Sequence, residues 1–156
     1  MAHRIDLGQR PCGDLPAKFE NKDLLESSVQ TPYELLGGEA GVRRLADTFY
    51  DVMNELPEAA SIRAMHGQEL APIKQKLFEY LSGWLGGPPL YRDKYNTICL
   101  FGAHKPFSIG PAQRDQWLRC MDEALRRVDA SPEVIAMLKE PMFRIADVMR
   151  NADQPA

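Results

Sequence analysis

The sequence predicts an all-α protein, and three observations support this. Apolar residues recur at three- and four-residue steps over several long segments, as they do along one face of an α-helix. Prolines and glycines stand between these segments, where helices begin and end. Neither the strict alternation of a half-buried strand nor an internal repeat is present. We therefore expect two pairs of long helices, with one conspicuous gap in the pattern.

The first 30 residues differ from the rest of the chain. They have little periodicity and contain several glycines and prolines, so we expect an N-terminal extension over residues 1–30. It is either mobile or partly helical, over residues 17–28. One helical domain is expected over residues 31–151, and a disordered tail over residues 152–156.

The domain is expected to begin with a short and then a long helix. Thr31 is a typical N-cap residue, Pro32 suits the first turn, and Gly37 and Gly38 end the short helix. The long helix ends at Pro57, and a turn follows over residues 61–66. Its apolar face comprises Val42, Leu45, Ala46, Phe49, Tyr50, Met53 and Leu56.

The next helix is predicted to end in the run GGPP at residues 86–89. Its apolar face comprises Leu70, Ile73, Leu77, Tyr80, Leu81 and Trp84. Over residues 88–103 the helical pattern breaks down, and we expect a long irregular loop there. Such loops inside compact domains are commonly functional, and this one leads directly to His104.

Two further helices are expected after residue 110. Pro111 begins the first, and Ser131 with Pro132 caps the second, which Pro141 is expected to bend. Their apolar positions are Trp117, Met121, Ala124, Leu125 and Val128, followed by Val134, Leu138, Met142, Ile145 and Met149.

Composition narrows the class of protein. The 156 residues suffice for one domain, and 44% hydrophobic with 26% charged residues is ordinary for a soluble protein. A net charge of −3 argues against a nucleic-acid partner. The N-terminus lacks the apolar core of a signal peptide, and no apolar run reaches membrane-spanning length. We expect a cytoplasmic protein without a membrane partner.

The three cysteines, Cys12, Cys99 and Cys120, are scattered and form no Cys-x-x-Cys pair. The sequence therefore supports neither a zinc ribbon nor a dithiol redox motif. Three free thiols suit a reducing compartment, and Cys120 is expected to be a buried, inert thiol.

His104 is the leading candidate for a functional side chain. Only His3, His66 and His104 could supply imidazole chemistry, and His104 lies in a stretch that suits a short turn. A single histidine among apolar residues is more often structural than a metal ligand. The long loop before His104 favours the second role, that of a metal ligand, because a haem needs a wider slot than ordinary helix packing leaves. With Tyr50 and Trp117 on neighbouring helices, the residues outline a haem pocket.

Four motifs carry a family resemblance. YELLGG at residues 33–38, WLGGP at 84–88, HKPF at 104–107 and RDQWLRCM at 114–121 occur in the order and at the spacings of a group II truncated haemoglobin. The chain resembles that family over residues 31–151. The resemblance implies a two-over-two helical sandwich of the globin superfamily that binds haem b.

The resemblance also implies roles for individual residues. His104 matches the proximal iron ligand, while Tyr50 and Trp117 match distal residues that stabilise the bound ligand. His66 is either a third distal residue, at a position where the family has tyrosine, phenylalanine or histidine, or a solvent-exposed histidine near the start of a loop. The expected haem-pocket residues are Phe49, Ile73, Lys76, Leu77, Tyr80, Tyr91, Leu100, Phe107, Ile109 and Met121. Among these, Lys76 and Tyr91 are either propionate contacts or surface residues. Residues 95–102 depart from the family, in which basic residues commonly precede the proximal histidine.

The implied function is reversible binding of oxygen, carbon monoxide or nitric oxide. An alternative is a haem redox enzyme, either peroxidase-like or a nitric-oxide dioxygenase, with no catalytic residue assigned. Because no Gly-x-Gly-x-x-Gly motif is present, such an enzyme would depend on an external reductase. A third alternative is a haem-free helical interaction module. A homodimer is left open.

Overall fold

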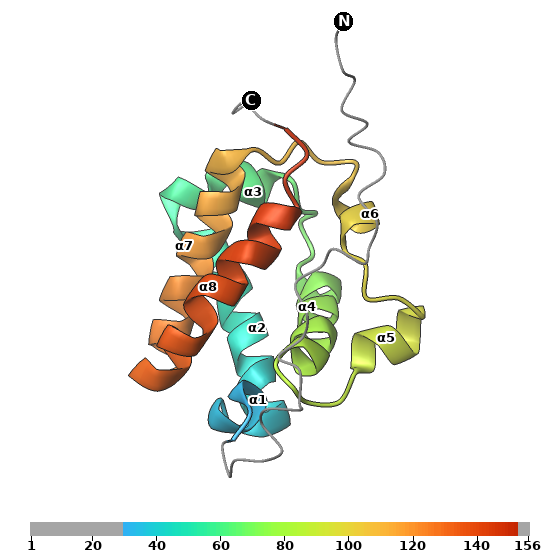
Figure 1. The fold of residues 1–156 in the computed structure, drawn as a ribbon. Helices are drawn as coiled ribbons and strands as arrows, with labels where there is room; N and C mark the ends of the chain where they lie inside the picture. The colour runs from blue at the N-terminus through green and yellow to red at the C-terminus, as the bar shows by residue number, and fades with distance from the viewer. Residues whose placement is uncertain (1–29, 153–156) are drawn as a thin grey trace, which may run out of the picture.

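The structure is a computed structural model that describes residues 30–152, and every regular element in that range is a helix (Figure 1). The all-α prediction is therefore confirmed. The predicted extension before Gln30 and the tail beyond Ala152 lie outside the described residues. The elements are α1 (Pro32–Leu35), α2 (Gly38–Glu55), the 3-10 helix η2 (Pro57–Ala59), α3 (Ala60–Ala64), α4 (Ala71–Trp84), α5 (Leu90–Tyr95), α6 (Phe101–His104), α7 (Pro111–Arg127) and α8 (Pro132–Val148).

Four long helices form the body of the domain. Helix α2 packs against both α4 and α7, and α7 packs against α8. In Figure 1, α7 and α8 run side by side, while α5 lies on the far side of α4 from them. This arrangement places α2 at the centre and leaves α6 at the periphery.

The apolar faces predicted from the sequence form the core. Leu45 and Phe49 of α2 and Leu138 of α8 are completely buried, and Met121 of α7 is nearly so. On α4, by contrast, Ile73, Leu77 and Tyr80 are only partly buried and pack at the edge of the core. The side of α4 that bears these three residues is therefore less completely covered than the centre of the domain.

The helix boundaries follow the predicted capping residues. The Thr31 hydroxyl accepts a hydrogen bond from the Glu34 amide, and the Glu34 carboxylate accepts one from the Thr31 amide, both at 3.2 Å. At the start of α8, the Ser131 hydroxyl accepts from the Val134 amide at 3.3 Å. Helix α2 ends at Glu55, two residues before Pro57, as expected.

The prediction of an irregular loop over residues 88–103 is wrong in part, because this region contains α5 and α6. These helices have six and four residues, too few to show a helical apolar pattern in the sequence. Helix α5 has no fully buried residue, so burial left no periodic signal either. Similarly, the predicted turn over residues 61–66 overlaps α3, which has five residues.

The cysteines differ from one another. Cys120 is a buried free thiol, and burial raises its pKa to about 11, which fits the expectation of an inert residue. Cys99 is disulfide-bonded, so the expectation of three free thiols is wrong.

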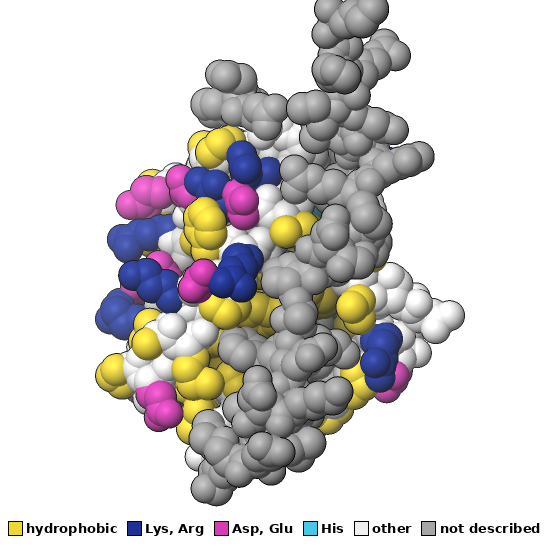
Figure 2. Space-filling view, viewed as in Figure 1, with side chains coloured by type: hydrophobic (Ala, Val, Ile, Leu, Met, Phe, Trp, Pro, Cys, Tyr) yellow, Lys and Arg dark blue, Asp and Glu magenta, His cyan; other side chains and the backbone are white. Residues whose placement is uncertain are grey.

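The described surface carries both signs of charge. Acidic and basic side chains alternate over α7 and α8 on the face shown in Figure 2. Among residues 30–152, no helix combines the length and the hydropathy needed to span a bilayer.

Gly41 allows the close approach of α1 and α2. A Cβ atom at this position would lie 1.7 Å from the carbonyl oxygen of Leu36, so the backbone would have to move. We expect Gly41→Ala to lower the free energy of unfolding by about 1–3 kcal/mol, although alanine favours helices. Gly67→Ala is the control, because a Cβ atom there meets no atom within 4 Å. Equal denaturation midpoints for the two variants would contradict the account.

Candidate functional site

His104 is the last residue of α6, and its ring is fixed by its own helix. Its Nδ1 atom lies 2.7 Å from the carbonyl oxygen of Leu100. Because a carbonyl oxygen can only accept, Nδ1 must carry the proton, and Nε2 of the neutral imidazole keeps its lone pair. Metal-binding histidines commonly have this arrangement, in which one ring nitrogen donates to a backbone carbonyl and the other binds the metal.

Asn151 ties the segment after His104 to the end of α8. Its side-chain nitrogen donates to the carbonyl oxygens of Phe107, at 2.6 Å, and His104, at 3.3 Å. Its side-chain oxygen accepts from the Ile109 amide at 2.8 Å, and its own amide donates to the Ile109 carbonyl at 2.9 Å. We call these four hydrogen bonds the Asn151 clamp.

An ion pair fixes the end of α8 close to the clamp. Arg114 of α7 donates to Asp147 of α8 at 2.8 Å, and Arg150 pairs with the same carboxylate at 2.6 Å. The two arginines lower the pKa of Asp147, although partial burial opposes this shift. Asp147 therefore remains charged at neutral pH. Its pair with Arg114 joins α7 to the end of α8, just before Asn151.

Tyr50 and Trp117 belong to one aromatic cluster centred on Phe49. The Phe49 ring lies 5.0 Å from the Tyr50 ring at 87°, and 5.2 Å from the Trp117 ring at 53°. Burial raises the pKa of Tyr50, which keeps its phenol protonated. Within residues 30–152, neither the Tyr50 hydroxyl nor the Trp117 N–H is hydrogen-bonded to protein. Two donors are thus left for another acceptor.

His66 joins this cluster from the end of α3. Its ring lies 5.5 Å from the Tyr50 ring, and its Nδ1 atom lies 2.7 Å from the Ile62 carbonyl. As in His104, Nδ1 must donate and Nε2 is left free. Burial lowers the pKa of His66, and the charges of Arg63 and His104 lower it further, against the effect of the Ile62 bond.

A surface cavity of about 380 Å³ lies beside His66. It is bounded by the last turn of α2 and by α3, with Met53, Leu56, Arg63 and Gln68 among its lining residues. Neither His104 nor Trp117 lines this cavity. It is therefore not the place where Nε2 of His104 or the Trp117 N–H would meet a ligand.

The other predicted pocket residues lie in several places. Phe49 and Met121 are core residues, and Leu100 accepts the bond from His104. Phe107 is 38% exposed. Tyr80 and Tyr91 are ring neighbours, and the Lys76 ammonium lies 5.8 Å from the centre of the Tyr95 ring.

Two important residues carried no signal in the sequence. Asn151 follows the last helix and resembles an ordinary terminal residue, because its partners are 42–47 positions away. Glu79 lies on α4 and is only 4% exposed, and its carboxylate pairs with Lys94 of α5 at 3.1 Å. A buried glutamate cannot be distinguished by sequence from an exposed one.

The chemistry of these donors fits a haem. His104 offers one free imidazole nitrogen of the type that binds iron, and Tyr50 and Trp117 offer hydrogen-bond donors for a ligand. Ile73, Leu77 and Tyr80 add apolar, partly buried surface on α4. The fold and these residues together define a globin-type protein.

Comparison with known proteins identifies the family. Residues 31–151 match the model of the bacterial-like globin family, and the chain belongs to that family. It is 33% identical over 107 residues to the group 2 truncated haemoglobin YjbI of Bacillus subtilis, covering 69% of this chain and 78% of that protein. Membership of this family supports a haem-binding, oxygen-binding protein.

Solved structures agree with the sequence relationship. A cold-adapted truncated haemoglobin from Pseudoalteromonas haloplanktis TAC125 superposes with a TM-score of 0.76 at 41% identity, covering 79% of this chain and 99% of that one. The group II 2-on-2 haemoglobin of Agrobacterium tumefaciens gives 0.75 at 40% identity, covering 80% and 97%. The predicted two-over-two truncated globin fold is therefore confirmed.

The Asn151 clamp is expected to stabilise the segment around Ile109 against local opening. Asn151→Ala removes the acceptor of the Ile109 amide, and a buried hydrogen bond of this kind contributes about 1–3 kcal/mol. We expect the Ile109 amide to exchange with solvent roughly ten- to hundredfold faster in the variant.

The Tyr33 amide, bonded to Leu85 at 3.0 Å, is the internal control in the same spectra and should not change. Unchanged exchange at Ile109, or equal acceleration at both amides, would show that the clamp does not specifically hold this segment.

Proposed function

We propose that this chain is a group II truncated haemoglobin that binds haem b through Nε2 of His104. The observation that carries the proposal is the 2.7 Å bond between His104 Nδ1 and the Leu100 carbonyl, which leaves Nε2 available. This bond also fixes which ring nitrogen carries the proton, so the opposite nitrogen keeps the lone pair that a metal needs. The clamp at Asn151 holds the residues on the other side of His104.

Tyr50 and Trp117 are proposed to hold the diatomic ligand. When bound, haem supplies a ferrous iron that takes oxygen, carbon monoxide or nitric oxide. The phenol and indole hydrogens would stabilise a ligand that gains negative charge, such as oxygen, more than carbon monoxide. His66 lies next to Tyr50 and is the third distal residue of the proposal. A solved relative from Bacillus subtilis is described as oxygen-avid, at 31% identity and a TM-score of 0.71.

We propose the following roles for the remaining pocket residues. Ile73 and Leu77 would cover one face of the haem, with Tyr80 at its rim. Ile73 has no polar atom in its side chain, so polar stabilisation falls to Tyr50, Trp117 and His66. Phe49 and Met121 would support the distal side from the core, and Leu100, Phe107 and Ile109 would contribute on the side of His104. Lys76 and Tyr91 are proposed propionate contacts.

The assignment of His104 predicts loss of haem on substitution. His104→Ala removes the iron ligand that the proposal requires, so the purified variant should lack a stable Soret absorption band. Lys105→Ala is the matched control, because Lys105 is the exposed neighbour of His104. A His104→Ala protein with full haem content and an unchanged spectrum would overturn the proposal.

The distal donors predict a change in oxygen release. Tyr50→Phe and Trp117→Phe should each speed release by roughly ten- to hundredfold, since each removes a hydrogen bond worth about 1–3 kcal/mol. Carbon monoxide release should change less. The effects should not add in the double variant, because both donors serve one ligand. Stopped-flow measurement of both gases tests this, and equal acceleration of the two would count against a polar distal pocket.

A further inference from the structure

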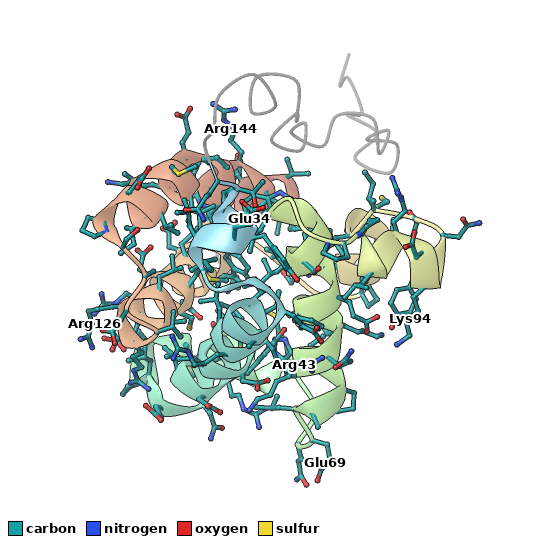
Figure 3. All side chains as sticks on the ribbon, turned by 90° about the horizontal axis from the view of Figure 1, so that it is seen from below. Glu34, Arg43, Glu69, Lys94, Arg126 and Arg144 are labelled. Atoms are coloured by element: carbon teal, nitrogen blue, oxygen red, sulfur yellow. The ribbon has the colours of Figure 1, made fainter. Side chains whose placement is uncertain are left out.

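Three tyrosines form a continuous series from α4 to α5. The Tyr80 ring lies 5.6 Å from the Tyr91 ring at 84°, and the Tyr91 ring lies 4.6 Å from the Tyr95 ring at 42°. Tyr80 packs at the edge of the core, whereas Tyr91 and Tyr95 belong to α5, on the outer side of α4 (Figures 1 and 3). The series therefore leads from the proposed haem rim toward the surface.

Two ammonium groups lie at the outer end of the series. The ammonium groups of Lys94 and Lys76 lie 5.4 and 5.8 Å from the centre of the Tyr95 ring. The Lys94 side chain is 55% exposed and projects at the edge of the molecule in Figure 3. An anion that approaches Tyr95 would meet both lysines.

A buried carboxylate holds this arrangement together. Glu79 of α4 is 4% exposed, and its carboxylate accepts a hydrogen bond from the Lys94 ammonium of α5 at 3.1 Å. This bond ties α5 to α4. Buried glutamates are rare unless they are paired. Burial raises the pKa values of Tyr80 and Tyr91, and neighbouring tyrosines add to the shift. Both phenols are therefore protonated at neutral pH.

We propose that Tyr95 is a surface oxidation site for small anionic one-electron reductants of the enediol class, with a hydroperoxide as the oxidant at the haem. Tyr91 and Tyr80 carry the electrons inward from Tyr95. The exposed Lys94 attracts the anion, and the half-buried Tyr95 ring accepts its electron. This inference rests on the proposed haem site and deepens its redox chemistry.

The overall reaction is balanced. The O–O bond of one hydroperoxide breaks and takes up two electrons and two protons, giving an alcohol and water. Each electron leaves Tyr95 together with its phenolic proton, which produces a neutral tyrosyl radical. One enediol monoanion then returns an electron and a proton to Tyr95 and becomes a radical anion. Two such anions are consumed for each hydroperoxide, and all three tyrosines return to their initial state.

Phenylalanine substitutions distinguish oxidation of the tyrosines from their packing between α4 and α5. A phenylalanine ring would hold α5 against α4 as well as tyrosine does, but it lacks the phenol that is oxidised. Tyr95→Phe should therefore fold and bind haem like the parent protein. Tyr91→Phe removes a proposed propionate contact as well, so it is compared with the parent at equal haem occupancy, measured from the Soret band. Tyr33→Phe is the matched control, because Tyr33 lies on α1 and contacts Gly87, outside the series.

The experiment treats the haem-loaded protein with hydrogen peroxide and a nitroso spin trap, and mass spectrometry then locates the adduct. We expect an adduct on Tyr95 in the parent and in Tyr33→Phe, and about tenfold less of it in Tyr91→Phe. With ascorbate as the reductant, Lys94→Gln should raise the concentration for half-maximal ascorbate oxidation by about tenfold, equivalent to about 1.4 kcal/mol.

The outcomes distinguish this inference from the proposed haem site. A parent protein with a Soret band but without an adduct on Tyr95 would overturn the tyrosine series alone. An adduct on Tyr95 that persists undiminished in Tyr91→Phe would also overturn it. A parent protein that acquires no Soret band would overturn the proposed haem site and this inference with it.

Discussion

The geometry of the site depends on hydrogen bonds that hold His104, because burial does little to fix this part of the chain. Helix α6 has four residues, and most of the positions after His104, including Phe107, are exposed. The Leu100 carbonyl sets the ring orientation, and Asn151 holds the backbone that follows. An imidazole with a fixed ring and one free nitrogen needs no reorganisation to bind a metal. The segment that follows His104 is therefore held by polar contacts to the end of α8.

The surroundings of Tyr50 and Trp117, the proposed distal donors, are built differently. Phe49 is completely buried between Tyr50 and Trp117, so helix packing between α2 and α7 fixes both donors. Close packing tolerates little movement, which suits donors that must meet a small ligand at a defined position. The two sides of the site thus differ in stiffness. The long helices hold the proposed distal donors Tyr50 and Trp117, and a few hydrogen bonds hold His104, the proposed iron ligand.

The sequence predicted the elements whose apolar residues are periodic and buried. The faces of α2, α4, α7 and α8 were identified correctly, and so were the caps at Thr31 and Ser131. Helices α5 and α6 were missed, because neither is long enough to show a helical repeat. Asn151 and Glu79 could not be recognised as structural residues, since their roles depend on partners that only the fold brings near. The assignments of the individual haem contacts remain predictions.

The central claim is that His104 is held with Nδ1 bonded to Leu100 and Nε2 directed at iron. A crystal structure of the haem-loaded protein tests this most directly. We expect iron coordinated by Nε2 of His104, with the Nδ1 bond to the Leu100 carbonyl retained. Iron bound by His66 with His104 free, or a haem with no bond to His104, would rule this arrangement out.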